Sequence, residues 1–329
     1  MNNNLLKNQK GSSETTREAF YFDFSKYIEN KPEHIKNIDQ TFLEWFVGFT
    51  EGDGSFIISS KKNKTRKNMF FFINQKDPKL MYKIKKELGF GQVIKYKQNN
   101  QFYYRYSISD IKNIIRLIHL FNGNLLLNKV QNNFNKWLDC YNELYSDKYI
   151  ENKYICPIIN LNSGWLSGFI DAEGYFYANI FLKNYIQKKI NLLPKMKKKW
   201  SNENYKLFQQ ISQYKPCISQ KMTLTQVSTK ETNKLFKQIL FLFKGKSFYI
   251  FQNSKVKKLS NKKYVRIEFS SLDSQKIIID YLSQYKLKTC KYISFIKWKR
   301  VYLRCIENVH LSPKGTQRLY RLIKSINNK

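Results

Sequence analysis

Two acidic residues draw attention because each closes a copy of the same short sequence. Asp53 ends the stretch WFVGFTEGD, Glu173 ends the stretch WLSGFIDAE, and each acid is followed directly by a glycine. Carboxylates bind hard cations such as Mg²⁺, which keep part of their coordination shell for substrate phosphates. A metal ion held at a phosphodiester can activate water and stabilise the leaving oxygen. A pair of such acids, brought together, therefore predicts phosphodiester hydrolysis.

Small residues at matched positions indicate how the two acids meet. Gly48 and Gly52 lie four residues apart in the first copy, and Gly168 and Ala172 do so in the second. Residues at this spacing share one face of a helix. A stripe of small residues lets two helix backbones approach closely. We therefore expect the two helices to form an interface through these four residues, with the acids side by side.

The ends of these helices favour a bound cation. Helix C-termini carry partial negative charge and free carbonyl groups, so two such ends and two acids repel one another unless a cation lies between them. We expect Mg²⁺ or Mn²⁺, held by Asp53 and Glu173 beside the helix-end residues Gly52 and Ala172. The alternative is that both acids are ordinary helix-end carboxylates held by nearby lysines. Duplication of the whole motif favours the metal site.

The composition points to a polyanionic partner. The 329 residues are 42% hydrophobic and long enough for two domains, and Lys+Arg 59 against Asp+Glu 24 gives a net charge of +35. Such a charge favours nucleic acid. The five cysteines show no C-x-x-C spacing and the three histidines are widely scattered, which argues against a zinc site, a disulfide framework or a Ser-His-Asp triad. No apolar stretch reaches the length of a membrane span.

Hydrophobic periodicity predicts the same order of elements twice: helix, two strands, helix, two strands, helix. This order defines an α+β fold of two equivalent halves. The spacing between matched residues increases abruptly between the first and second strands of the second half, which locates a basic insertion there. The expected division is an N-terminal extension (1–40), a first half-domain (41–150), a linker (151–163) and a second half-domain (164–329) with an insertion at about 183–220.

The duplicated stretch resembles the motif of the LAGLIDADG homing endonucleases, and the likeness runs from Thr41 to Trp298. The resemblance implies a single chain folded as a pseudo-twofold pair of αββαββα units, whose saddle-shaped antiparallel sheets lie along the major groove of a long DNA site. It implies double-strand cleavage with a divalent metal and mobility of a host intron. Asp53 and Glu173 match the family's metal ligands, whereas Glu51 and Asp171 occupy an earlier acidic place that we interpret as structural.

Matching the repeats places further candidate catalytic residues. Lys129 and Lys291 fall where family members carry a basic residue near the scissile phosphates, and a lysine there can stabilise developing charge. Gln75 and Gln226 end matched strands, where the family often has polar residues that organise solvent. The alternatives are exposed lysines before a helix and ordinary hydrogen bonding at strand ends.

The strands also predict a recognition surface. Each sheet shows an apolar and a polar parity, and the polar parity carries one matched arginine,. Arginine in the major groove reads guanine, and asparagine or glutamine reads adenine. The candidate DNA-binding residues are Asn74, Lys95, Lys97, Tyr103, Arg105, Thr223, Thr225 and Arg266.

Three functions are consistent with the sequence. The first is a monomeric, site-specific endonuclease of double-stranded DNA; the second is a maturase that binds group I intron RNA on the same scaffold. The third is a basic DNA-binding protein without catalysis, which the paired acids disfavour. The richness in Asn, Lys, Ile, Tyr and Phe is typical of an A/T-rich organellar genome, and we expect a mitochondrial protein, with the chloroplast as the alternative.

Overall fold

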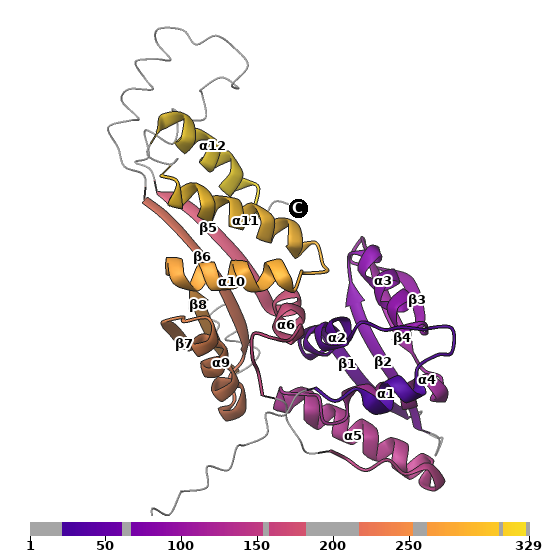
Figure 1. Cartoon of the computed structure of the whole chain (residues 1–329). Coiled ribbons are helices and arrows are strands. Elements are labelled where there is room, and N and C mark those ends of the chain that lie inside the picture. Colours follow the sequence, from indigo (N-terminus) through magenta and orange to yellow (C-terminus); the bar gives the residue numbers. More distant parts are fainter. Residues whose placement is uncertain are drawn as a thin grey trace, which may run out of the picture.

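The computed structural model describes residues 22–60, 67–153, 158–181, 217–252, 262–308 and 312–326. These residues form two four-stranded antiparallel sheets with the same strand order, β1-β2-β4-β3 and β5-β6-β8-β7. The two sheets lie on either side of a central pair of helices, α2 and α6 (Figure 1). The predicted α+β fold of two pseudo-symmetric halves is therefore confirmed.

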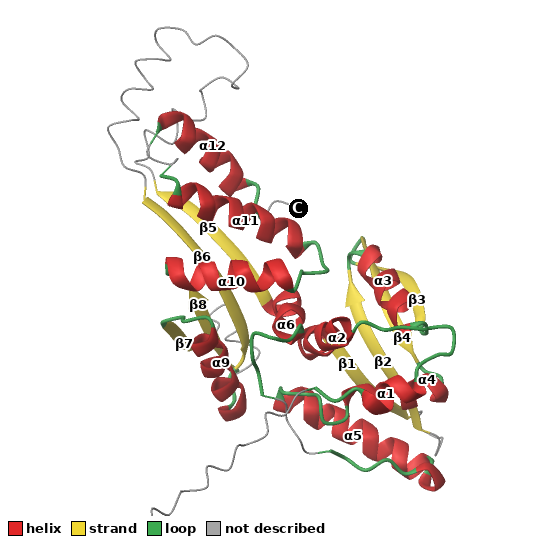
Figure 2. Cartoon of the chain, in the orientation of Figure 1, coloured by secondary structure: helices red, strands yellow, loops and turns green. Residues whose placement is uncertain are grey.

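The first half contains most of its helices on one side of the sheet (Figure 2). Its elements, in order, are α1 Ser25–Asn30, α2 Gln40–Asp53, β1 Gly54–Ser60, β2 Lys67–Gln75, α3 Pro78–Leu88, β3 Gln92–Gln98, β4 Gln101–Ile108, α4 Ile111–Phe121, α5 Asn128–Leu144 and a 3₁₀ turn at Ser146–Lys148.

The second half repeats this order from α2 onward and adds one helix at its end. Its elements are α6 Trp165–Glu173, β5 Gly174–Phe181, β6 Cys217–Val227, α9 Lys230–Leu242, β7 Ser247–Gln252, β8 Lys263–Phe269, α10 Leu272–Gln284, α11 Lys291–Ile306 and α12 Pro313–Lys324. Helix α12, which the sequence did not predict, packs on α11 and β5.

Local sequence signals fix the ends of several helices. Asp77 caps α3 by accepting a hydrogen bond from the Lys79 amide, and Gly89 ends that helix in a left-handed conformation with φ 78°,. Asp110 caps α4, as its position before the apolar helical period of residues 111–121 indicates. The cap of α10 is Ser271, and Asp273 lies in the first helical turn. A carboxylate there still interacts favourably with the helix dipole.

Alternation along the strands separates a core face from an open face. In β8, Val265, Ile267 and Phe269 are fully buried, while the residues between them are half-buried. Tyr106 and Ile108 take the corresponding core positions in β4. The period of two in the sequence therefore predicted correctly which face of each sheet meets the helices.

Two expected boundaries differ in the structure. Phe22, Phe24 and Tyr27 are buried against the first half, so residues 22–30 are part of that half's core rather than a separate tail. Residues 217–220 belong to β6, because they pair with β5 in an unbroken register from Gly174↔Leu224 to Phe181↔Cys217. The rest of the predicted insertion, up to residue 216, lies outside the described residues. Within the described part of the chain, no helix combines the length and apolarity needed to cross a bilayer.

Candidate active site at the interface of the two halves

Helices α2 and α6 pack with their backbones in direct contact. A Cβ atom built on Gly48 would lie 2.1 Å from the Trp165 carbonyl oxygen, and one built on Gly168 would lie 1.9 Å from the Trp45 carbonyl oxygen. Neither position has room for any side chain. The small-residue stripe therefore lies at the contact between the halves, and it sets how far apart the helix ends can be.

The helix ends bring Asp53 and Glu173 to the same place. A Cβ atom on Gly52 would stand 2.2 Å from the Ala172 Cβ and 3.2 Å from the Glu173 Cγ. Only a residue without a side chain fits between the two acid-bearing ends. Each helix then passes directly into a strand, β1 at Gly54 and β5 at Gly174, which leaves both carboxylates at the centre of the molecule.

A glutamine holds each acid from the end of the neighbouring strand. The Gln75 Nε2 donates to the Asp53 Oδ2 at 2.7 Å, and the Gln226 Nε2 donates to the Glu173 Oε1 at 3.1 Å. These are strand-end hydrogen bonds, and they also orient the acids. Each acid therefore has one oxygen held by a glutamine, and among the described residues no second glutamine bonds its other oxygen.

The two candidate lysines are not equivalent. The Lys291 Nζ donates to the Ala172 carbonyl oxygen at 2.6 Å and lies 3.4 Å from the Ile170 carbonyl oxygen. Ala172, a predicted metal neighbour, thus gives its carbonyl to an ammonium group. Lys129 is exposed at the start of α5. The halves share a fold but differ in the surroundings of their lysines.

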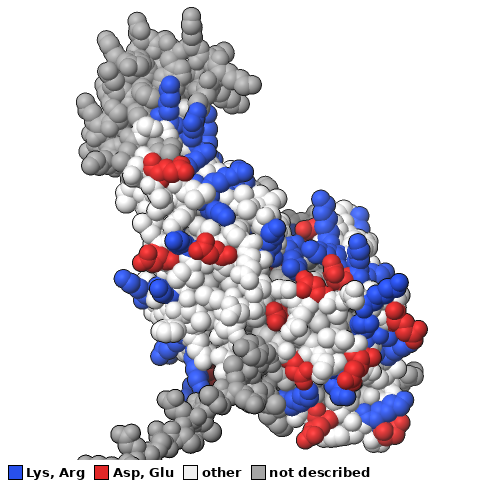
Figure 3. All heavy atoms as spheres, in the orientation of Figure 1, with Lys and Arg blue, Asp and Glu red and all other residues white. Residues whose placement is uncertain are grey.

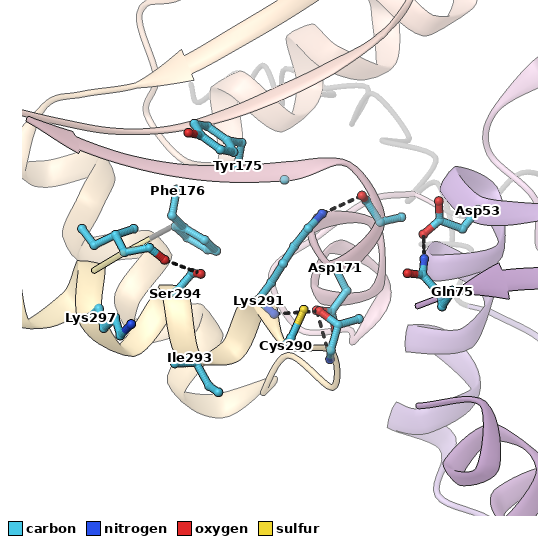
Figure 4. Close-up of a pocket in the computed structure, with 14 residues that line it drawn as sticks. Asp53, Gln75, Asp171, Tyr175, Phe176, Cys290, Lys291, Ile293, Ser294 and Lys297 are labelled. Carbon is cyan, nitrogen blue, oxygen red and sulfur yellow. Dashed lines mark hydrogen bonds between the residues drawn. The ribbon is translucent and has the colours of Figure 1, made fainter. Parts of the chain in front are cut away.

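Each lysine shares a cavity with the acid of the opposite half. A cavity of about 680 Å³ is lined by Lys291 and Tyr175 of the second half together with Asp53 and Gln75 of the first. Figure 4 shows Lys291 directed toward the end of α6, with the Asp53–Gln75 pair facing it from the other half.

A second cavity, of about 280 Å³, is the counterpart of the first. It is lined by Lys129 and Asn133 of the first half together with Glu173 and Gln226 of the second. The molecule therefore contains two composite sites, and each takes its acid and glutamine from one half and its lysine from the other.

Burial and mutual repulsion disfavour the charged forms of the acids. Burial, and after it the negative charge of Asp53, raise the pKa of Glu173 to about 7, against the opposing effect of Lys291. Burial also raises the pKa of Asp53 and lowers the pKa of Lys291, although the surrounding acids oppose the second shift. A cation between the two carboxylates would relieve this repulsion.

The donor set suits a hard divalent cation better than a soft one. Among the described residues, no group of three or more His, Cys, Asp and Glu side chains is placed to hold a metal ion. The two carboxylates supply only oxygen ligands and leave most of a coordination shell open. That arrangement is typical of Mg²⁺ at substrate phosphates, and it excludes a closed structural site.

A family model described as LAGLIDADG endonuclease matches residues 46–141, which span α2 to α5. The second half repeats the same topology around its own copy of the motif. The first half of the chain therefore matches the LAGLIDADG endonuclease family. The match covers the first half only, and it is the internal repeat that extends the assignment to the second.

Two proteins similar to this chain carry names of intron-encoded proteins. A Neurospora crassa protein named probable intron-encoded endonuclease 4 is 28% identical over 97% of this chain, and the match covers 47% of that protein. The chain thus spans about half the length of this relative. A Saccharomyces cerevisiae protein named intron-encoded RNA maturase bI4 is 26% identical, over 53% of this chain and 27% of its own length.

A solved structure shares the fold of this chain. I-SmaMI, bound to an uncleaved DNA target in the presence of calcium ions, is 18% identical, with a TM-score of 0.60 over 87% of this chain and 99% of its own. At this identity the likeness establishes the fold of the two halves. It does not by itself transfer a ligand.

The open faces of the two sheets carry a matched pair of arginines. Arg105 pairs across the sheet with Asn74, and Arg266 pairs with Thr225. The Arg105 Nε donates to the Asn74 Oδ1 at 2.9 Å, and the Arg266 Nε donates to the Thr225 Oγ1 at 3.0 Å. Each guanidinium also lies over an aromatic ring, Phe72 or Phe251 respectively.

Cross-strand partners place two predicted DNA-binding lysines on the other face. Lys95 pairs with Tyr104 and Lys97 pairs with Phe102, so both lie on the opposite face of the pleat from Arg105. The Lys95 ammonium covers the Phe102 ring at 4.2 Å. This placement disfavours their predicted contact with a DNA duplex that lies on the arginine face. Lys and Arg side chains are visible on the surface of both halves (Figure 3).

The two other predicted DNA-binding residues, Tyr103 and Thr223, differ in how exposed they are. Tyr103 lies on the arginine face, stacked on Tyr96 with a ring separation of 5.8 Å. Thr223 shares that parity in the second half but is only 8% exposed, because its cross-strand neighbours Tyr175 and Glu268 cover it. Direct contact of Thr223 with DNA is therefore disfavoured.

Sequence reasoning missed the two tryptophans that open the motif copies. Trp45 and Trp165 each stand eight residues before the candidate metal-binding acid, at the same position of the repeat. Their indole N–H groups donate to Asp171 and Glu51 of the opposite helix at 2.8 Å and 2.6 Å. The matched spacing was the available signal, but a buried tryptophan usually indicates only a core residue.

Proposed function

We propose that this chain is a site-specific endonuclease that cleaves double-stranded DNA with a divalent metal and promotes mobility of its intron. The observation that carries the proposal is the pair of composite sites at the centre of the molecule. Two acids, each with its glutamine and a lysine from the other half, lie between two sheets with polar open faces. Two sites related by pseudo-symmetry suit the two strands of a duplex.

Asp53 and Glu173 would hold the metal, which when bound activates water and neutralises charge at the scissile phosphates. Gln75 and Gln226 fix one oxygen of each acid and leave the other toward the cavity. Lys291 and Lys129 place an ammonium group in each cavity, where it can stabilise negative charge that develops on a phosphate.

DNA recognition is assigned to the open faces of the sheets. In Arg105 and Arg266 the Nε is engaged within the protein, which directs the two terminal nitrogens outward as a fork. That fork matches the O6 and N7 acceptors of guanine in the major groove. Stacking on Phe72 and Phe251 reduces the freedom that each arginine would lose on binding.

We also propose that the protein acts as a monomer in mitochondria. Both halves and both sites lie in one chain, so no second copy is needed to complete them. The two relatives described above come from fungi, and nothing in their names supports the chloroplast alternative.

The decisive experiment incubates purified protein and Mg²⁺ with a plasmid library that carries randomised target DNA, and with the DNA that flanks its own intron. Wild type, Asp53→Asn and Glu173→Gln are compared by mapping cut ends. Cuts at one sequence, absent from both variants, are the expected result. Absence of cleavage by the wild type on every substrate would overturn the proposal.

The second candidate is a group I intron maturase, favoured by the similarity to the Saccharomyces cerevisiae RNA maturase. It predicts that the protein binds its intron RNA and accelerates splicing, and that Glu173→Gln retains both activities. Cleavage and splicing are measured on the same preparations, so a dual role appears as activity in both assays.

A further inference from the structure

Two buried acids stand two residues before the metal-site acids. Glu51 and Asp171 are each only 2% exposed. A buried carboxylate without partners is strongly destabilising, so its hydrogen bonds show what it holds in place. In both halves the hydrogen bonds come from the loop before a candidate lysine and from the tryptophan of the opposite motif helix.

Glu51 connects the first lysine to the second half. Its Oε1 accepts from the amides of Leu126 and Leu127, both at 2.5 Å, and its Oε2 accepts from the Trp165 indole at 2.6 Å. Leu127 is the residue before α5, and Lys129 is the second residue of that helix. One carboxylate therefore joins the start of the lysine helix to the motif helix of the opposite half.

Asp171 makes the equivalent connection for the lysine of the second half. Its Oδ2 accepts from the Lys288 amide at 2.6 Å and from the Trp45 indole at 2.8 Å. Its Oδ1 accepts from the Thr289 hydroxyl at 2.5 Å, and the same hydroxyl accepts from the Lys291 amide at 3.1 Å. The loop before the second lysine is thus joined to the motif helix of the first half.

Each connection joins the same two parts of the molecule as one composite site, namely a lysine of one half and the motif helix of the other. Lys129 shares its cavity with Glu173, which lies on the same helix as Trp165. Lys291 shares its cavity with Asp53, which lies on the same helix as Trp45. Each carboxylate therefore links a lysine to the helix that carries the acid it faces.

We propose that Glu51 and Asp171 are positioning residues, each of which sets the distance between the lysine and the acid of one composite site and so governs cleavage of one DNA strand. The proposal rests on the endonuclease function proposed above. It predicts that loss of either carboxylate impairs one site and leaves the other intact.

An amide has one acceptor oxygen in place of two, so Glu51→Gln cannot accept from both the loop and the indole. The same holds for Asp171→Asn. The control is Glu44→Gln, since Glu44 also bonds across the interface, to the Gly164 amide at 2.7 Å, but touches neither lysine loop. If Glu51→Gln fails to fold, Trp165→Phe removes the indole donor alone.

The first measurement is hydrogen exchange of the metal-free protein, which requires no substrate. Glu51→Gln is expected to speed exchange of the Leu126 and Leu127 amides by about tenfold or more, and Asp171→Asn to do so at Lys288 and Thr289. Unchanged exchange at these amides would overturn the proposal, as would equal acceleration at both loops by either variant.

The second measurement is nicking of each strand of a supercoiled plasmid that carries a target selected by the wild type. Lys129→Met and Lys291→Met first assign a strand to each site. Glu51→Gln should slow the Lys129 strand by about tenfold, since small misplacements are costly, and the Lys291 strand by less than about twofold.

Asp171→Asn should show the reverse strand bias, and Glu44→Gln no bias. Equal slowing of both strands by Glu51→Gln would show general destabilisation and overturn the proposal. If the wild type cuts no DNA, the endonuclease proposal fails, and the exchange data still decide whether the carboxylates hold the lysine loops.

Discussion

Replacing Gly168 with alanine is expected to force the two central helices apart. The added Cβ would lie 1.9 Å from the Trp45 carbonyl oxygen and 2.8 Å from the Phe49 amide nitrogen. Ordinary contact begins at 3.4 Å, so α2 would have to withdraw by 3.4 − 1.9 = 1.5 Å. Both obstructing atoms belong to the backbone, so no change of rotamer can relieve the clash.

The cost follows from the rigidity of that contact. Overpacking of a buried site costs about 1–3 kcal/mol, and a site without side-chain relaxation should lie near the upper end, at about 3 kcal/mol. The displacement also moves Glu173 away from Asp53, because both acids end the helices that separate. A shift of this size can reduce cleavage by about a hundredfold.

Equilibrium unfolding in urea and plasmid cleavage would test this reasoning. The control is Ser167→Ala, which changes the preceding residue of α6; the Ser167 side chain is 1% exposed and its Oγ has no hydrogen-bond partner. It should retain wild-type stability to within about 1 kcal/mol. If Gly168→Ala is as stable as the control, the helices are not in backbone contact and the argument fails.

Three further predictions concern charge, pH and recognition. Asp53→Asn and Glu173→Gln should each lower Mg²⁺-dependent cleavage by at least about a hundredfold while DNA binding in EDTA persists; cleavage near the wild-type rate would remove that acid from the metal site. The pKa of Glu173 is raised from 4.5 to about 7, so the folded protein binds more protons than the unfolded chain between these values, and metal-free stability should fall by roughly 3 kcal/mol as pH rises through that window. Urea titrations in EDTA measure the slope, which Glu173→Gln should reduce and Mg²⁺ should oppose; an unchanged slope in that variant would contradict the assignment. Arg105→Ala should relax a guanine preference on one side of the target by about 1–3 kcal/mol in binding-site selection, with Arg266→Ala acting on the other side; loss of preference on both sides from one variant would contradict the face assignment.

Periodicity and repetition in the sequence were enough to predict much of this fold. The motif copies at Asp53 and Glu173, the alternation in β4 and β8, and the caps at Asp77 and Asp110 are local features, set by the chemistry of neighbouring residues. Because the repeat covers helix, strands and helix in the same order, it also determined the pairing of two halves. The structure confirms this architecture.

The composite nature of the sites was decided only by tertiary packing. The sequence places Lys291 in the second half, and nothing in its spacing indicates that it faces Asp53 of the first. Glu51 and Asp171 looked structural because their partners, the loop amides and the opposite tryptophans, are distant in the chain. Likewise, the face occupied by Lys95 depends on its cross-strand register with Tyr104.

Sequence therefore identified the candidate catalytic residues and the elements that hold them, because composition, capping and period act over a few residues. Tertiary structure decided which of those residues act together. The two motif helices are in backbone contact at Gly48 and Gly168, and residues of each half lie beside residues of the other across this interface. A contact between segments distant in the chain produces no periodic pattern in either sequence, so the sequence alone could not predict it.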